Sequence, residues 1–153
     1  MLMEEQEMAE TTKKKVLFVC THNSARSQMA EAFLNKYGEN RFEAESAGLK
    51  AGILNPLVVT VMKEIGIDIA GNRTKNVLDF YKQGKRYHYV ITVCDESAAQ
   101  TCPIFPGILT KTIHWDFKDP SSFQGTWEEK LAKTREVRDL MEQKINEWIT
   151  SIN

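Results

Sequence analysis

A cysteine and an arginine frame a short loop in this sequence, which reads Cys20-Thr21-His22-Asn23-Ser24-Ala25-Arg26-Ser27. The apolar run 16–19 before the loop predicts a buried strand, and the stretch 27–37 after it is typical of a helix. In a turn between a strand and a helix, successive backbone N–H groups face one concavity and form an anion site, which the helix dipole strengthens. The pattern therefore predicts a strand-to-helix turn that binds an anion.

The side chains of this loop suit a tetrahedral oxyanion. Arg26 carries a planar fork that can bind two oxygens of a phosphate-like group. The same positive field favours the thiolate form of Cys20, which is its nucleophilic form. We therefore expect Cys20 to attack an oxyanion bound by the rest of the loop, which consists of Thr21, His22, Asn23, Ser24, Ala25, Arg26 and Ser27. The alternative is a small buried cysteine at a strand end, with Arg26 a surface charge.

Length and charge narrow the class of protein. A chain of 153 residues fits one domain, and a net charge of −1 gives no general attraction to nucleic acid or acidic lipid. No apolar run approaches the roughly 20 residues that span a bilayer, so no membrane partner is expected. The acidic start lacks the basic and apolar parts of a signal peptide. We expect a disordered extension at 1–12, a domain at 13–153 and a cytoplasmic location.

The remaining sequence alternates between strand and helix patterns. Apolar runs predict strands at 14–20, 42–46, 87–93 and 110–114, and helical spacing predicts helices after Asn55-Pro56 and after the capping box at Thr126. This order implies an α/β domain with a parallel sheet. Ligands of such sheets bind at the carboxyl ends of the strands. Cys20, Ser46, Cys94 and Asp119 are expected to meet at that edge.

Two further cysteines, Cys94 and Cys102, complete the three in the chain. So few cysteines argue against a disulfide framework and suggest reactive or metal-binding thiols. The scattered histidines and the lack of a Cys-x2-Cys pair disfavour metal, so no metal site is predicted. We interpret the pair as redox-active, receiving oxidation from Cys20; the alternative is two buried thiols near a turn.

Asp119, which precedes Pro120, is the expected general acid because a carboxylic acid beside the oxyanion can protonate a leaving oxygen. Asp116 is the competing candidate. The alternative for Asp119 is a turn aspartate before a proline.

Several motifs in order resemble one family. The motifs that carry the likeness are Val16 to Cys20, Asn23-Ser24, Arg26 to Glu31, Ser46-Ala47-Gly48, Asn55-Pro56, Met62-Lys63-Glu64, Val93-Cys94, Cys102-Pro103, His114-Trp115, Asp119-Pro120 and Val137-Arg138-Asp139. The sequence resembles the arsenate reductases built on the low-molecular-weight tyrosine phosphatase fold, over about residues 14–150. The resemblance implies a single domain with a four-stranded parallel sheet flanked by helices, Rossmann- or flavodoxin-like.

The resemblance also implies a reaction. Arsenate, with phosphate or sulfate as mimics, would bind in the loop, and Cys20 would attack arsenic while Asp119 protonates the departing oxygen. Cys94 would then attack Cys20 and Cys102 would attack Cys94. The resulting Cys94–Cys102 disulfide would be reduced by thioredoxin or glutaredoxin, the thioredoxin-coupled type being favoured, and no cofactor is implied.

The chain departs from the family at a few positions. His22 stands where glycine is frequent, Ala25 where some members have cysteine, and the interval between Cys94 and Cys102 is one residue longer than in thioredoxin-coupled members. Some members bind potassium near the loop; Asn23, Glu31 and Ser46 match such a site, but no acidic counterpart lies near Asn76, so the metal prediction stays negative.

Two other functions use the same loop. Cys20, Arg26 and Asp119 would suffice for phosphotyrosine hydrolysis through a phosphocysteine. In that case Cys94 and Cys102 would have no role, and Ser121 stands where the phosphatases usually have tyrosine. A non-catalytic oxyanion or redox sensor is the third hypothesis, which an intact acid and nucleophile disfavour.

Overall fold

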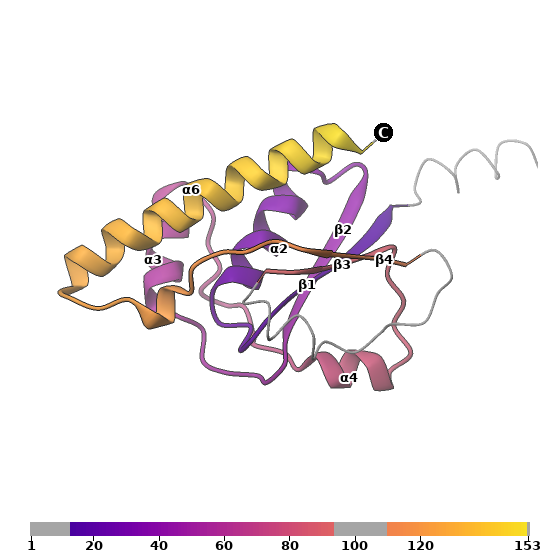
Figure 1. Cartoon of the computed structure of the whole chain (residues 1–153), viewed down its shortest axis with the longest axis horizontal. Coiled ribbons are helices and arrows are strands. Elements are labelled where there is room, and N and C mark those ends of the chain that lie inside the picture. The colour runs from indigo at the N-terminus through magenta and orange to yellow at the C-terminus, as the bar shows by residue number, and fades with distance from the viewer. Residues whose placement is uncertain (1–12, 94–109, 153) are drawn as a thin grey trace, which may run out of the picture.

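Four parallel strands form the centre of the molecule, in the spatial order β2-β1-β3-β4 (Figure 1). The computed structural model describes residues 13–93 and 110–152. The strands are β1 (Lys14–Cys20), β2 (Phe42–Gly48), β3 (Tyr89–Thr92) and β4 (Lys111–His114). All three pairings are parallel, which confirms the predicted four-stranded parallel sheet of an α/β fold.

Two strands differ in length from the prediction. β2 continues two residues past Ser46, because Ala47 and Gly48 stay in register with the last two residues of β1. Ser46 therefore lies opposite Phe18, inside the sheet and not at its edge as expected. β3 is shorter than the predicted 87–93, although the N–H groups of His88 and Val93 still donate to the carbonyls of β1.

All described helices except α2 (Arg26–Tyr37), whose N-cap is Ala25, begin at polar caps. The others are α3 (Pro56–Glu64), α4 (Val77–Lys82) and α6 (Trp127–Ser151), with a 3-10 turn η1 (Pro120–Ser122). Asn55 accepts a hydrogen bond from the backbone of Leu57, and Thr126 accepts one from Glu129, as N-caps do. The sequence reasoning missed α4, a short helix capped by Asn76 in the same way.

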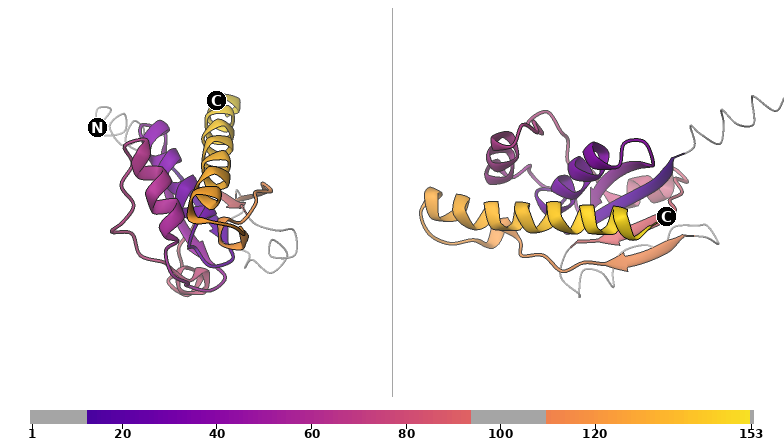
Figure 2. Two further views of the ribbon diagram at one scale, coloured as in Figure 1. Left: turned by 90° about the vertical axis from the view of Figure 1, so that its left-hand side faces the viewer. Right: turned by 90° about the horizontal axis from the view of Figure 1, so that it is seen from above.

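The sheet separates two apolar layers. On one face, Val16 and Phe18 pack with residues of α2, α3 and α6 in the larger core. On the other face, Leu17 and Val19 pack with α4 in a smaller core. Figure 1 and the left view of Figure 2 show α6 and α4 on opposite sides of the sheet. Cys20 belongs to the larger core, so its side chain lies on the α2 side.

The predicted extension, residues 1–12, lies outside the described residues, as do Cys94 and Cys102. In the described part, none of the helices has the length and apolar content to cross a bilayer.

Candidate active site

The Cys20 thiol lies at the carboxyl end of β1, where the chain turns into α2. Its Sγ is 2.7 Å from Oγ of Ser27, in the first turn of α2. Nδ2 of Asn23 donates to the same Oγ at 2.8 Å. Because that hydroxyl already accepts a hydrogen bond, its own hydrogen is available to donate to the sulfur. Ser27 therefore links the Cys20 sulfur to the Asn23 side chain through two hydrogen bonds.

Asn23 holds the loop in shape from within. It is fully buried and has φ of 55°, a left-handed conformation that asparagine tolerates better than most residues. Its Oδ1 accepts hydrogen bonds from Nε2 of Gln28 at 3.0 Å and from the backbone N–H of Lys75 at 2.9 Å. Gly48 lies against it so closely that a Cβ there would be 2.6 Å from the Asn23 nitrogen. The loop is therefore fixed by its neighbours in β2 and before α4.

Arg26 opens α2 and is 3% exposed. One of its terminal nitrogens donates to the carbonyl of Phe117 at 3.1 Å, and the other lies 3.4 Å from Oδ2 of Asp119. Its Nε is buried and has no hydrogen-bond partner among residues 13–93 and 110–152. A buried donor without a partner is rare in folded proteins and is often explained by an absent ion or ligand. Arg26 is thus anchored at one side and has donor capacity left.

Asp119 reaches the site from the segment after β4. Its side chain is 30% exposed, and its Oδ1 accepts from the backbone of Ser121, so it also caps η1. The hydroxyl of Ser121 accepts from Asn55, whose own N–H donates to the carbonyl of Ser24 in the loop. These bonds tie the Asp119 segment to the Cys20 loop across about a hundred residues of chain.

The structure thus brings together three of the predicted catalytic residues, Cys20, Arg26 and Asp119. The loop residues predicted to bind substrate divide by exposure: Thr21 and His22 are partly or fully exposed, while those from Asn23 to Ser27 are buried. Asp116, the competing acid, lines a separate groove, whereas the described contacts of the Arg26 guanidinium are with Phe117 and Asp119. Cys94 and Cys102 lie outside the described residues.

Sequence reasoning missed the residues that support the loop from other elements. These are Gln28, Lys75, the Phe117 carbonyl, and the pair Asn55 and Ser121. A backbone carbonyl leaves no signature in the sequence. Gln28 does leave one, because an amide in the first turn of a helix that packs on a sheet has to find partners when it is buried.

The described residues hold no cluster of side chains suited to a metal ion. No group of three or more His, Cys, Asp or Glu side chains in 13–93 and 110–152 lies close enough to hold an ion. The chemistry described here is that of a thiol, a guanidinium and a carboxylate.

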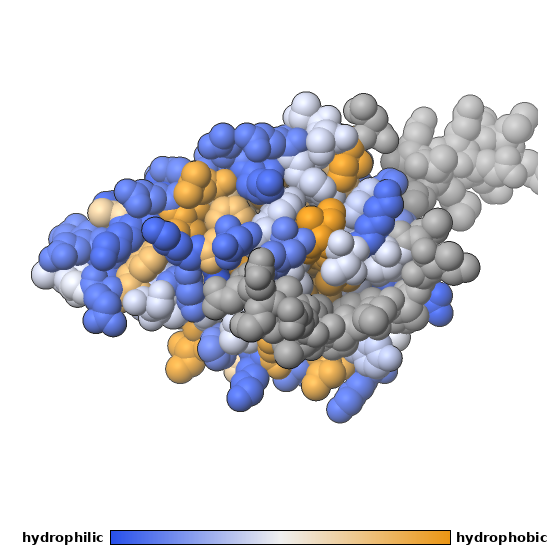
Figure 3. All heavy atoms as spheres, in the orientation of Figure 1, coloured by the Kyte–Doolittle hydropathy of each residue, from blue (hydrophilic) through white to orange (hydrophobic). Residues whose placement is uncertain are grey.

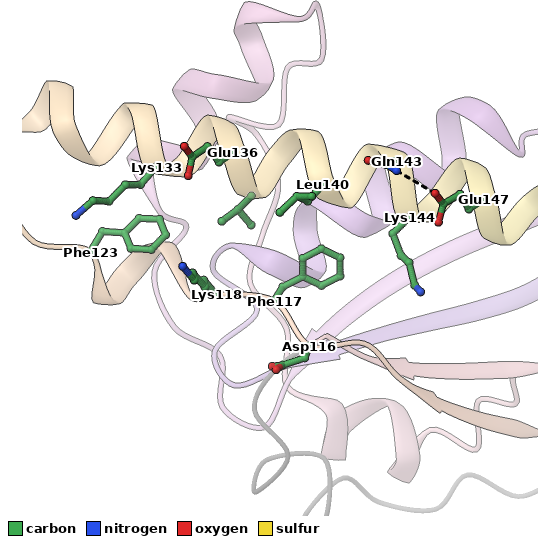
Figure 4. A pocket seen from close by; sticks show the side chains of 11 residues that line it. Asp116, Phe117, Lys118, Phe123, Lys133, Glu136, Leu140, Gln143, Lys144 and Glu147 are labelled. Carbon is green, nitrogen blue, oxygen red and sulfur yellow. Dashed lines mark hydrogen bonds between the residues drawn. The ribbon is translucent and has the colours of Figure 1, made fainter.

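A hollow of the described surface lies apart from these three groups. A groove of about 810 Å³ runs between α6 and the segment that follows β4 (Figure 4). Figure 3 shows patches of apolar side chains between charged ones along this side of α6. Phe117, whose carbonyl anchors Arg26, is one of the groove's lining residues.

Comparison with known proteins agrees with this fold. A profile of the family described as low molecular weight phosphotyrosine protein phosphatase matches residues 15–153. The chain belongs to this family.

Within the family, several similar proteins are arsenate reductases, and one similar solved structure is a low molecular weight protein tyrosine phosphatase, with a TM-score of 0.70 and 26% identity. The chain is 42% identical to the Bacillus subtilis arsenate reductase over 135 residues, which span 88% of this chain and 94% of that protein. A solved arsenate reductase in the oxidized state has a TM-score of 0.75 and 29% identity, covering 92% of this chain and 99% of the other. A thioredoxin-dependent arsenate reductase from Corynebacterium glutamicum has a TM-score of 0.67 and 28% identity, covering 94% and 63%. The resemblance read from the sequence is confirmed.

Proposed function

We propose that this protein is an arsenate reductase that converts arsenate to arsenite and serves arsenic detoxification. The observation that carries the proposal is the pairing of Cys20, hydrogen-bonded to Ser27, with a buried Arg26 that has an unpartnered Nε. Arsenate is a tetrahedral oxyanion, which this combination of thiol and guanidinium suits. The names of the similar proteins support the same substrate.

The first step forms a bond between sulfur and arsenic. Arsenate binds to the loop amides and Arg26, and the Cys20 thiolate attacks arsenic while one oxygen leaves. Asp119 supplies the proton that turns this oxygen into water. The salt bridge between Asp119 and Arg26, at 3.4 Å, supports this assignment because both groups can reach one bound anion. No electrons have moved to arsenic at this stage.

The next steps carry the electrons. The Cys94 thiolate attacks the Cys20 sulfur, the sulfur–arsenic bond breaks with its electron pair on arsenic, and arsenite leaves. Cys102 then attacks Cys94, which frees Cys20 as a thiolate and leaves a Cys94–Cys102 disulfide. Two electrons thus pass from two thiols to one arsenic. Because both cysteines lie outside the described residues, the support for this relay is chemical and comes from the sequence.

A thiol protein is the proposed reductant. Thioredoxin is favoured by the similarity to a thioredoxin-dependent reductase, and glutaredoxin is the alternative. Either reductant operates in a reducing compartment, so the proposed location is the cytoplasm.

Phosphatase activity is the second candidate, favoured by the family to which the chain belongs. Cys20, Arg26 and Asp119 contain all the groups that hydrolysis through a phosphocysteine needs. We propose it as a residual activity, since it leaves Cys94 and Cys102 without a role.

The test measures arsenate-dependent NADPH oxidation with thioredoxin and thioredoxin reductase, and separately with glutathione and glutaredoxin. The wild-type chain should turn over with one system, and Cys20→Ser should not turn over with either. Cys94→Ser should stall with arsenic on Cys20. Cys102→Ser should release one equivalent of arsenite and accumulate a Cys20–Cys94 disulfide, visible by mass.

A generic phosphate ester provides the control. Cys94→Ser and Cys102→Ser should hydrolyse it as well as the wild type does, because hydrolysis needs neither thiol. Multiple turnovers of arsenate by either variant at the wild-type rate would contradict the relay. Hydrolysis without any arsenate reduction in the wild type would replace the proposal with a phosphatase.

A further inference from the structure

An ammonium group lies behind the nucleophile loop, against the sheet. Nζ of Lys75 is 3.7 Å from Oε1 of Glu31 and 3.4 Å from Oγ of Ser46. The Lys75 and Glu31 side chains are 23% and 17% exposed, and Ser46 is fully buried. This cluster joins α2, β2 and the segment before α4, and none of its members is used in the reaction described above.

The backbone of Lys75 contacts the loop directly. Its N–H donates to Oδ1 of Asn23 at 2.9 Å, and its carbonyl accepts from the N–H of Gly48 at 2.8 Å. The amide of the same Asn23 donates to Ser27, which contacts the Cys20 sulfur. A continuous hydrogen-bonded path therefore runs from Lys75 to the nucleophile.

The carboxylate that faces Lys75 belongs to Glu31, and its negative charge would weaken anion binding in the nearby loop. Glu31 lies one helical turn after Ser27 on α2. Burial raises the pKa of Glu31, against the lowering effects of Lys75 and of hydrogen bonds from Ser46, and the nearby charge of Glu45 raises it further. An ionised and uncompensated Glu31 would oppose both a thiolate and a bound oxyanion, because like charges repel strongly where water is scarce.

We propose that Lys75 is a positioning residue of this site: its backbone fixes Asn23, and its ammonium cancels the Glu31 charge behind the loop. The chain thereby supplies its own cation to keep the loop electropositive. The assignment rests on the proposed function only in that the loop binds an oxyanion beside the Cys20 thiolate. It adds a residue outside the loop that sets how strongly the loop does so.

The test compares Lys75→Met with Lys75→Arg, which keeps the charge. Lys85→Met is the matched control, because the Lys85 ammonium pairs with Glu45, on the same strand as Ser46, at 2.8 Å and lies over the Phe80 ring, away from the loop. One readout is sulfate affinity by calorimetry, since sulfate keeps its charge across the pH range used. The other is the pH dependence of Cys20 alkylation by iodoacetamide, followed by mass on the Cys20 peptide.

Lys75→Met should bind sulfate about tenfold more weakly and need a pH about one unit higher for half-maximal alkylation, as expected for one uncompensated charge nearby. Its deficit should grow as the pH rises through the titration of Glu31, because the carboxylate then becomes charged. Lys75→Arg and Lys85→Met should stay within about threefold of the wild type, the former because it keeps a cation. Sulfate affinity in Lys75→Met within twofold of the wild type would overturn the proposal.

The double variant Glu31→Gln/Lys75→Met distinguishes the effect of the Lys75 charge from the effect of Lys75 packing. It should recover sulfate affinity and lose the added pH dependence, because no buried carboxylate is left to compensate. It also keeps the test open if Lys75→Met alone does not fold, since it carries no unpaired charge. A double variant as impaired as Lys75→Met would reduce Lys75 to a packing role and overturn the proposal. Neither readout uses arsenate, so sulfate binding without arsenate turnover would refute the reductase function and leave this assignment standing.

Discussion

Two buried arginines show how the same side chain serves different ends in this molecule. Arg138 on α6 is 8% exposed and uses its donors within the protein, on the Val61 carbonyl and Glu64 at 2.9 Å each and on Asp139 at 2.8 Å. Arg26 is 3% exposed, yet among the described residues its Nε has no partner and its contact with Asp119 is 3.4 Å long. Arg138 joins α6 to α3, whereas Arg26 keeps a buried donor that has no partner among the described residues.

The comparison shows that burial alone does not distinguish a structural cation from a functional one. Buried charges normally have partners, and each unmet donor costs free energy in the folded state. A fold that tolerates such a cost at Arg26 and avoids it at Arg138 is what the proposed oxyanion site at Arg26 predicts. The two arginines therefore predict opposite patterns of activity and stability when they are replaced.

The largest effect is expected from Arg26→Ala set against Arg138→Ala. Arg26→Ala should lower kcat/KM for arsenate by at least about 10²–10³-fold, the usual cost of losing an oxyanion donor. It should cost less stability than Arg138→Ala, because the carbonyl that loses its donor, Phe117, is only partly buried and an unpartnered buried Nε is removed as well. Arg138→Ala should lose about 1–3 kcal/mol of stability because the Val61 carbonyl loses its partner, with near-normal activity per folded molecule. Steady-state kinetics and urea unfolding of both variants would measure this. Equal losses of activity would erase the distinction.

The next largest loss of activity is expected from replacing Asp119, which lies beside Arg26 but has a different proposed role. Asp119→Asn should lower kcat for arsenate by about 10²-fold, as expected for loss of a general acid, and leave sulfate affinity unchanged or stronger because a negative charge is removed. Asp116→Asn is the control and should be close to the wild type. A fall in sulfate affinity without a fall in kcat would show that Asp119 acts only by holding Arg26.

Two replacements of Asn23 distinguish how much its hydrogen bonds and how much its backbone conformation contribute to stability. Asn23→Gly removes the amide that contacts Ser27 and Lys75 but accepts φ of 55° without strain, and should lose about 1–3 kcal/mol of stability. Asn23→Ala should lose roughly 1 kcal/mol more, because an L residue with a Cβ is strained there. Urea unfolding measures both. Equal stability of the two variants would mean that the left-handed turn relaxes when its hydrogen bonds are gone.

The sequence predicted the strands and the longer helices because apolar periodicity and polar caps are local. It also predicted that Cys20 and Asp119 would meet, since the carboxyl ends of parallel strands share an edge. It placed Ser46 wrongly at that edge, because the length of β2 is set by pairing with β1 and not by its own residues. The short helix α4 was missed for a related reason, as six residues give too little periodicity to recognise.

Within the site, the residue types were predictable and their contacts were not. Arg26 was expected to bind an anion, but its anchor is a backbone carbonyl at Phe117, which any residue could provide. Ser27 was expected to contact substrate, and the structure gives its hydroxyl to the Cys20 sulfur. Such contacts depend on how two loops pack together, so they emerge only with the tertiary fold.

The smallest effect concerns Glu64, which receives Arg138 and also Arg135 on the surface between α3 and α6. Hydrogen bonds from Arg135, and then from Arg138, hold the pKa of Glu64 below its ordinary value of 4.5. A carboxylate with a lowered pKa stabilises the fold at pH above 4.5, and this contribution is lost as the pH falls through the lower folded pKa. The contribution is small because the group is exposed and screened.

Glu64→Gln should therefore lower Tm slightly at pH 7 without changing activity, and its Tm should approach that of the wild type as the pH falls below about 4.5. Calorimetry across this range, at low and high salt, would follow the convergence; salt should shrink the difference at pH 7 because it screens exposed charges. Lys133→Gln, on the same helix, is a control that should show no such pH dependence. A Tm difference that stays constant from pH 7 into acid would mean that Glu64 acts through packing. Arg135 and Arg138 would then stabilise the contact between α3 and α6 through the fit of their side chains and not through their charge.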